Sequence, residues 1–244
     1  MAFIPRIYIY EEGTPGERIF VGGGDASHIL RVLRRGKGDG IFVCDTRSVS
    51  YDAVIDEVTP EGFYAVLGQP RVRDAEPVCP VTLYQCLPKG EKTDDLVRRA
   101  VELGATRIVA VISERCVARP DGKSFAKRLE RLNRISESAA AQCGRASVPP
   151  VCGLISYREA VAELAACGLG FICYEGDGTR PLRGIIEGSR PESIGFLIGP
   201  EGGLSDSETA LALERGLPLA GLGRRIMRTE TASAYVLSAI DILL

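Results

Sequence analysis

The chain has 244 residues, of which 45% are hydrophobic and 25% are charged, and its net charge is −2. These proportions are typical of an ordinary globular protein and exclude a disordered, fibrous or membrane-embedded chain. No apolar run approaches the roughly 18 residues that cross a bilayer. The amino terminus shows no basic start followed by a long apolar stretch, so no signal peptide is predicted. We therefore expect a cytoplasmic protein with one large domain or two modest ones.

Eight cysteines and a single histidine could suggest a disulfide framework or a metal site. However, no two of the cysteines form a C-x-x-C pair, and zinc sites usually need Cys or His at close paired spacing. Most of the cysteines lie in apolar contexts, where a free thiol behaves as a small hydrophobic side chain. The sequence therefore predicts reduced, mostly buried thiols and no metal.

Residues 1–70 read mainly as short strands separated by Gly, Pro and Asp, at 6–10, 18–21, 40–44, 50–58 and 62–68. One short helix interrupts them. Asp25 or Ser27 is expected to cap this helix. Its buried side is expected to consist of Ile29, Leu30, Val32 and Leu33. We predict a small β-barrel domain over 1–70 that carries one basic helix.

Residues 71–80 are rich in proline and charge and poor in aliphatic side chains, which is typical of a domain linker. After it, strands at 81–87 and 107–112 flank a helix at 93–103, and this βαβ unit predicts a mainly parallel sheet in a second domain over 81–244. The remaining expected elements are helices at 124–143, 157–167, 205–215 and from 229, and strands at 169–174, 194–198 and 218–221.

Basic residues gather in two stretches of this mildly acidic chain. Residues 26–38 contain four basic residues and no acid, and residues 115–145 contain eight basic residues against three acids. On the helix at 124–143, Lys127, Arg131 and Arg134 fall opposite the apolar side. Such patches can neutralise several phosphates. The alternative is that each patch is only a solvated helix face.

Three loops are expected to gather at one edge of the parallel sheet, because each follows a strand. They are 174–178, the Gly-Pro-Glu-Gly-Gly run at 199–203, and 222–228. Ligands bind beyond the carboxyl ends of strands in open α/β sheets, where glycines let backbone groups approach a ligand. Neither common phosphate-loop motif occurs. This arrangement predicts an enzyme whose ligand is held by backbone groups.

Residues 198–203, followed by Leu-Gly-Arg-Arg-Ile-Met-Arg-Thr-Glu-Thr-Ala at 222–232, resemble the bacterial 16S ribosomal RNA uridine N3-methyltransferases of the SPOUT class. The Leu-Pro-Lys-Gly run at 87–90 with Lys92, the segment 142–149, and a PUA-like segment at 28–39 extend the resemblance over most of the chain. The resemblance implies a SPOUT-type α/β sheet with a carboxyl-terminal trefoil knot, preceded by a PUA-like β-barrel. It also implies an S-adenosylmethionine cofactor, a homodimer, and small-subunit ribosomal RNA or the 30S particle as partner, with no DNA and no membrane.

On this basis, main-chain and side-chain groups of the three loops are expected to bind the cofactor. A uracil that loses its N3 proton carries negative charge on two carbonyl oxygens, so Arg228 is the expected stabiliser. Arginine stays protonated in proteins and is a poor base. For proton removal we favour Glu201, with Glu230 second. The expected cofactor-binding residues are Tyr174, Leu197, Ile198, Gly199, Glu201, Gly202, Gly203, Leu222, Gly223, Ile226, Met227, Thr229 and Ala232, and the expected RNA-binding residues are Arg31, Arg34, Arg35, Lys127, Arg131 and Arg134.

Other interpretations stay open at this point. The chain could be another SPOUT methyltransferase, acting on a ribose 2′-hydroxyl or another base, or a catalytically silent RNA-binding or ribosome-assembly factor. Thr229 could only cap the final helix, and Arg228 could only form a surface salt bridge. The final helix is apolar on more than one side, which predicts that it packs on its own sheet and on a second subunit.

Overall fold

The computed structural model describes residues 4–71, 75–90 and 92–244. The chain forms two compact units. One holds the described part of residues 1–76 together with 140–147, and the other holds the described part of 77–139 together with 148–244. The linker expected over 71–80 includes residues 72–74, which lie outside the described residues, as does the start of the chain at 1–3. Each unit is described by itself below.

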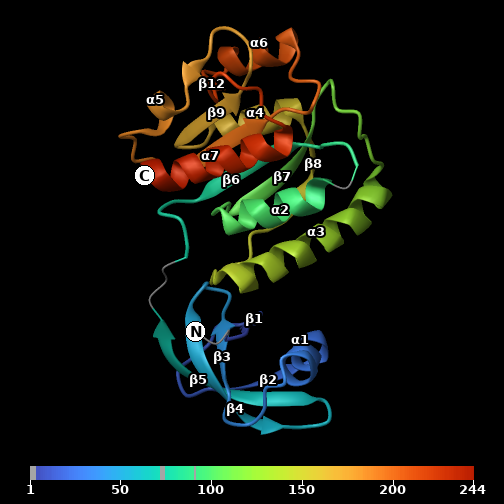
Figure 1. Ribbon diagram of the computed structural model, residues 1–244, viewed down its shortest axis with the longest axis vertical. Helices are drawn as coiled ribbons and strands as arrows, with labels where there is room; N and C mark the ends of the chain where they lie inside the picture. Colours follow the sequence, from blue (N-terminus) through green and yellow to red (C-terminus); the bar gives the residue numbers. More distant parts are fainter. Residues whose placement is uncertain (1–3, 72–74, 91) are drawn as a thin grey trace. The chain divides into compact units, whose positions relative to one another are not determined.

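The first unit is built on a five-stranded sheet in the described part of the chain (Figure 1). Its order is β1-β3-β4-β5-β2, with β1 parallel to β3 and the other neighbours antiparallel. Inward side chains alternate with outward ones and form one core, which includes Ile19, Ile41 and Phe63. The hydrogen-bonded sheet stays open between β1 and β2, so the described strands form a half-barrel. The strands are Arg6–Tyr8 (β1), Arg18–Gly22 (β2), Gly40–Cys44 (β3), Ser50–Val58 (β4) and Gly62–Arg71 (β5).

The helix of the first unit differs from the expectation at its start and on its buried side. Helix α1 spans Gly23–Ser27 and continues into a π-helical turn, η1, over His28–Val32. The predicted caps were wrong, because the helix begins before Asp25, directly after the extended Gly22. Ile29 is buried as expected, but Val32 is 66% exposed. The wider π-turn advances each residue by a smaller angle, so the pattern expected for an α-helix does not hold at Val32.

A buried ion pair holds residues 140–147 in the first unit. The Arg145 guanidinium lies 2.8 Å from the Glu76 carboxylate, and its side chain is 2% exposed. Glu76 also accepts hydrogen bonds from the backbone N–H groups of Ala146 and Ser147, and the Tyr8 hydroxyl donates to the Arg145 carbonyl. Burial alone would raise the pKa of Glu76, but the Arg145 guanidinium and the hydrogen bonds from Ser147 outweigh burial and lower it. This segment lies in the range that composition assigned to the second domain.

The second unit contains a seven-stranded parallel sheet in the described residues, which confirms the expected parallel arrangement. Its order is β10-β12-β9-β11-β6-β7-β8, so β11 lies in the middle, between β9 and β6. The edge strands β8 and β10 were not expected. The strands are Val81–Cys86 (β6), Arg107–Ile112 (β7), Val151–Ser156 (β8), Leu169–Cys173 (β9), Arg180–Pro181 (β10), Ile194–Ile198 (β11) and Leu219–Gly221 (β12).

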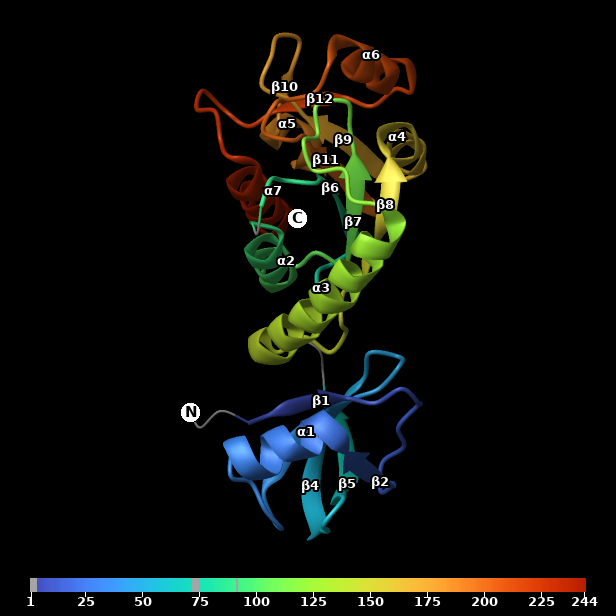
Figure 2. The same ribbon diagram turned by 90° about the vertical axis from the view of Figure 1, so that its right-hand side faces the viewer.

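Helices cover both faces of this sheet. Helices α2 and α7 lie side by side on one face, with α5 against α7, and α4 and α6 lie on the other (Figure 2). Helix α3 packs through Phe125 and Leu129 on Ala110 and Leu154. Helix α6 begins with the predicted capping box of Ser205 and Glu208. The helices are Lys92–Glu102 (α2), Gly122–Cys143 (α3), Tyr157–Ala165 (α4), Arg183–Ile186 (α5), Asp206–Glu214 (α6) and Thr229–Leu243 (α7).

All eight cysteines are free thiols. Cys44, Cys86, Cys116 and Cys173 are buried as expected, whereas the other four are only half-buried. Within the described ranges, no helix is long and apolar enough to cross a membrane.

Candidate active site

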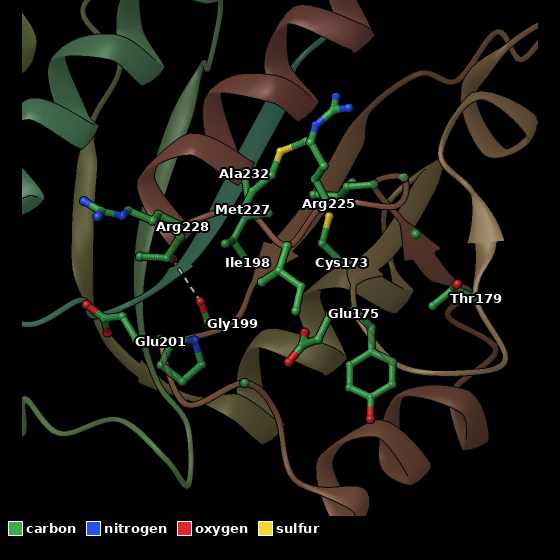
Figure 3. Close-up of a pocket in the computed structure, with 18 of the residues that line it drawn as sticks. Cys173, Glu175, Thr179, Ile198, Gly199, Glu201, Arg225, Met227, Arg228 and Ala232 are labelled. Carbon is green, nitrogen blue, oxygen red and sulfur yellow. Dashed lines mark hydrogen bonds between the residues drawn. The ribbon is translucent and has the colours of Figure 1, made fainter.

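The three loops expected to gather do so, and they enclose a cavity of about 380 Å³ (Figure 3). The loops follow β9, β11 and β12, and both β11 and β12 pair with β9. Because parallel strands place their carboxyl ends at the same edge, the loops after them meet. The cavity volume falls in the range of small-molecule sites.

The loop at 199–203 is shaped by close contacts around its glycines. Gly203 has a φ of +68°, which disfavours residues with a Cβ atom, and a Cβ there would lie 2.4 Å from a carboxylate oxygen of Glu175. A Cβ at Gly199 would press on Leu204, which is buried. The lack of a side chain at Gly203 therefore lets Glu175, from the loop after β9, lie close against the loop after β11.

Thr229 ties the start of α7 to the loop after β11. Its hydroxyl donates to the Gly199 carbonyl at 2.9 Å (dashed line in Figure 3) and accepts from the Gln85 amide at 2.8 Å. Gln85 lies at the end of β6 and is 3% exposed. The N-cap of α7 is Arg228, and no side chain caps the helix. The interpretation of Thr229 as a mere helix cap was therefore wrong, because its hydroxyl joins the loop after β11 to strand β6.

Arg228 lines the cavity and its side chain is exposed. Its guanidinium and the Glu201 carboxylate extend to the same side of the cavity (Figure 3). Among the residues that the structure describes, no acidic side chain forms an ion pair with Arg228. The alternative that Arg228 only forms a surface salt bridge therefore lacks an acidic partner among the described residues.

Glu201 and Glu230 share one cation. The Lys92 ammonium lies 3.6 Å from Glu201 Oε1 and 3.4 Å from Glu230 Oε1, and the Lys89 backbone N–H donates to Glu201. Burial alone would raise the pKa of Glu201, but its own backbone N–H, that of Lys89 and the Lys92 ammonium outweigh burial, so the pKa lies below its ordinary value. The second oxygen of Glu230, Oε2, is buried without a hydrogen-bond partner.

Most of the predicted site residues line the cavity, but three do not. Leu197 is fully buried and points to the opposite side of β11 from Ile198, because successive strand residues alternate. Gly202 faces Arg115, whose guanidinium bonds its carbonyl, and Glu230 lies behind the wall beside Lys92. The predicted residues that line the cavity are Tyr174, Ile198, Gly199, Glu201, Gly203, Leu222, Gly223, Ile226, Met227, Arg228, Thr229 and Ala232.

Several lining residues were not predicted. Glu175 belongs to a loop that was expected at this edge, and Arg224 and Arg225 lie within the recognised run at 222–232, so their positions were a usable signal. Nothing in the local pattern indicated Thr179, which reaches the cavity from the segment before β10. The unpredicted lining residues are Cys173, Glu175, Thr179, Pro200, Gly221, Arg224 and Arg225.

The predicted RNA-binding residues lie in both units. Arg31, Arg34 and Arg35 belong to the first unit, where Arg35 pairs with Asp39 at 3.9 Å. Lys127, Arg131 and Arg134 belong to the second. All three are exposed on α3, but Arg131 forms an ion pair with Asp94 of α2. The predicted stripe on α3 is therefore partly neutralised within the protein.

Comparison with known proteins defines the class to which this fold and cavity belong. The family model described as RNA methyltransferase domain matches residues 74–241. Ribosomal RNA small subunit methyltransferase E of Synechocystis sp. is 33% identical over 219 residues, covering 89% of this chain and 70% of that protein. The protein of the same name from Bacillus subtilis is 30% identical over 224 residues, covering 90% and 88%.

A solved structure agrees with these relatives. Ribosomal RNA small subunit methyltransferase E from Neisseria gonorrhoeae, bound to S-adenosyl methionine, matches with a TM-score of 0.89 and 33% identity over 99% of this chain and 98% of that chain. The chain belongs to the RNA methyltransferase family that includes these ribosomal RNA small subunit methyltransferases E.

Proposed function

We propose that this protein is an S-adenosylmethionine-dependent methyltransferase that modifies N3 of one uridine in the 16S ribosomal RNA of the small subunit. The observation that carries the proposal is the cavity at the carboxyl edge of β9, β11 and β12, in a chain that matches an S-adenosyl methionine-bound relative over nearly its whole length. The relatives' names support the ribosomal RNA substrate. The choice of uracil N3 rests on the resemblance of residues 198–203 and 222–232.

The residues of the cavity fit S-adenosylmethionine. The volume of about 380 Å³ suits a drug-sized molecule, and Gly223, at a φ of +107°, leaves open space where a side chain would stand. Glu175 brings a carboxylate to the wall, which suits a positively charged ligand. When bound, the cofactor supplies a methyl group attached to a sulfonium. Ile198, Gly199, Leu222 and Met227 would hold it through the lining of the three loops.

Arg228 is proposed to bind and stabilise the uracil while its N3 proton is lost. The charge of the resulting anion lies on the carbonyl oxygens that flank N3, and a guanidinium presents N–H donors in a planar fork that suits them. Holding the base in line with the methyl group supplies much of the acceleration, because it removes the need to find the reactive geometry by diffusion.

Glu201 is the favoured proton acceptor because it lines the cavity on the same side as Arg228. Its lowered pKa makes it a weak base, so the proton would pass quickly to solvent. Glu230 stays the second candidate, since it lies behind the cavity wall and pairs with Lys92.

The finer features implied by the resemblance belong to this proposal. We infer that the chain is threaded into a trefoil knot around the loops of the cavity, that the half-barrel unit is PUA-like, and that the enzyme acts in the cytoplasm as a homodimer. We also infer that the domains span 1–70 and 81–244, joined by a linker at 71–80. The proposed RNA contacts are Arg31, Arg34, Arg35, Lys127, Arg131 and Arg134, on a substrate that is either ribosomal RNA or the assembled 30S particle.

The proposed function is tested by identifying which atom of the RNA receives the methyl group. Small subunits that lack the modification, and naked RNA as a parallel sample, are incubated with the protein and methyl-labelled S-adenosylmethionine. The RNA is then digested and analysed by mass spectrometry. We expect N3-methyluridine at one position. A methyl group on a ribose or on another base would replace the proposal with a different RNA methyltransferase, and the absence of both transfer and cofactor binding would indicate a silent RNA-binding protein.

A further inference from the structure

Lys92 lies at a junction of three segments, beside Glu201, which lines the candidate site. It is the first described residue of α2, and its ammonium pairs with Glu201 from the loop after β11 and Glu230 from the first turn of α7. The Lys89 backbone N–H donates to the same Glu201 carboxylate at 3.2 Å. The ammonium is therefore fixed from two sides by elements that also form the cavity.

The surroundings of Glu230 explain why Lys92 is held. The Glu230 side chain is 16% exposed, and one of its oxygens is buried without a hydrogen-bond partner. A carboxylate in that position is costly unless a charge compensates it, and among the described residues Lys92 is the cation paired with it. The Lys92 side chain is nevertheless 40% exposed, so part of the ammonium faces solvent.

The Lys92 ammonium can donate a further hydrogen bond. It carries three N–H groups, and its two carboxylate partners are ion pairs at 3.6 Å (Glu201) and 3.4 Å (Glu230), so at least one N–H group is left for a further acceptor. Glu201 lines the cavity, and its carboxylate extends to the side on which Arg228 also lies (Figure 3). Lys92 is not among the residues that line the cavity, but its ammonium lies 3.6 Å from Glu201, which lines the side of the cavity where the proposed reaction places its substrate base.

We propose that Lys92 is a second cationic donor to the target uracil, binding one of the two carbonyl oxygens that flank N3 while Arg228 binds the other. The proposal rests on the proposed function. Loss of the N3 proton spreads negative charge onto both oxygens, so two fixed cations stabilise the anion more than one does.

The same pair of donors selects the base. Uracil presents carbonyl acceptors on both sides of N3, whereas cytosine presents an amino donor at position 4. A cation that faces this amino group meets another hydrogen-bond donor and cannot form a hydrogen bond with it, which disfavours cytosine. The two cations together therefore contribute to specificity as well as to rate.

The test replaces Lys92 by Met and measures methyl transfer over a range of pH. We expect Lys92→Met to lower kcat on the order of 100-fold, as removal of one charge-stabilising donor does, while S-adenosylmethionine affinity by calorimetry is unchanged. Because the bound uracil loses a stabilising cation, its N3 proton leaves at higher pH, so the pH–rate profile of the variant shifts upward. Lys92→Arg should keep most of the activity.

Lys89→Met is the matched control. Lys89 is exposed shortly before α2, and the substitution removes a charge of the same kind but keeps the backbone N–H that binds Glu201. An equal loss of kcat in Lys89→Met and Lys92→Met, or a pH–rate profile that does not shift in Lys92→Met, would overturn the proposal.

Lys92→Met also leaves Glu230 without its cation, so the variant could fail for lack of stability. The double variant Lys92→Met with Glu230→Gln removes that unpaired charge, and its melting curve should return toward the parent's. If the proposal holds, the double variant shows a shifted profile and a loss of kcat well beyond that of Glu230→Gln alone, which is measured in parallel because Glu230 is the second candidate proton acceptor. Recovered activity in the double variant would assign Lys92 a purely structural role and would overturn the proposal.

RNA binding gives a readout that does not depend on turnover. With S-adenosylhomocysteine in place of the methyl donor, affinity of the parent protein for unmodified substrate should tighten as pH rises, because the site favours the uracil anion. This increase should be smaller in Lys92→Met and unchanged in Lys89→Met. If the parent protein makes a product other than N3-methyluridine, the proposed function fails. If it makes N3-methyluridine and Lys92→Met behaves like the parent, this inference alone fails.

Discussion

The position of Arg228 at the site depends on the hydrogen bonds of the next residue, Thr229. Arg228 has extended backbone angles and serves as the N-cap of α7, and Thr229 bonds both Gly199 and Gln85. The backbone at Arg228 is therefore held by a turn that is hydrogen-bonded on two sides, and this places the exposed Arg228 side chain at the cavity.

Replacing Arg228 by Ala should remove turnover and leave cofactor binding intact. We expect a loss of about 100- to 1,000-fold in kcat, the usual effect of deleting a donor to developing negative charge. S-adenosylmethionine affinity is measured by calorimetry on the same preparation. Arg215→Ala, which removes an exposed arginine at the end of α6, is the control. Full activity in Arg228→Ala would refute the assigned role.

Helix α3 shows that an exposed basic stripe is not uniformly free. Arg131 pairs with Asp94, and the Arg128 guanidinium bonds the Thr93 hydroxyl and the Gly90 carbonyl. Lys127 and Arg134 have no such partner among the described residues. At the scale of the helix, these two residues are the better candidates for phosphate contacts, because a charge already paired within the protein releases fewer counterions on binding.

The salt dependence of RNA affinity tests the basic stretches. A variant with Lys127→Gln, Arg134→Gln and Arg34→Gln should show a shallower slope of log affinity against log salt, by about one for each phosphate that the variant no longer neutralises. The affinity is measured by filter binding or fluorescence at several salt concentrations. Arg183→Gln, on α5 and already paired with Glu187, should leave the slope unchanged. If the triple variant keeps the parent slope, the stretches only aid solubility.

At the scale of the whole molecule, helix α7 has two apolar sides. Val236, Leu237 and Ile240 are buried on the side that faces the sheet and α2, while Tyr235 is 45% and Ile242 is 78% exposed. Exposed apolar side chains on a helix that is already packed on its inner face are typical of a surface that another subunit covers. This distribution supports the proposed homodimer.

Light scattering tests the dimer. At micromolar concentration we expect twice the mass of one chain, and the double variant Tyr235→Glu with Ile242→Glu should shift the mass toward a monomer, because two buried charges would oppose association. Leu213→Glu, at an exposed apolar residue of α6, should remain dimeric. A parent protein that runs as a monomer at this concentration would contradict the proposal.

Local pattern was enough for most elements of the second unit. The strands at 107–112 and 194–198, the start of α7 at residue 229 and the capping box of Ser205 and Glu208 were predicted as the structure has them. These features depend on residues a few positions apart, and alternation, helical period and caps record such interactions in the sequence. The convergence of three loops also followed, because parallel strands end at a common edge.

Contacts between distant residues were decided only by the tertiary structure. Nothing in the local pattern links Gln85 to Thr229, Lys92 to Glu201 and Glu230, or Arg145 to Glu76. The edge strands β8 and β10 and the exposure of Val32 were likewise missed, because each depends on what lies beside it. The sequence by itself determined the order of most elements and the loops that could form a site. Folding determined which side chains share that site, since hydrogen bonds and ion pairs depend on distance in space, whereas sequence patterns record distance along the chain.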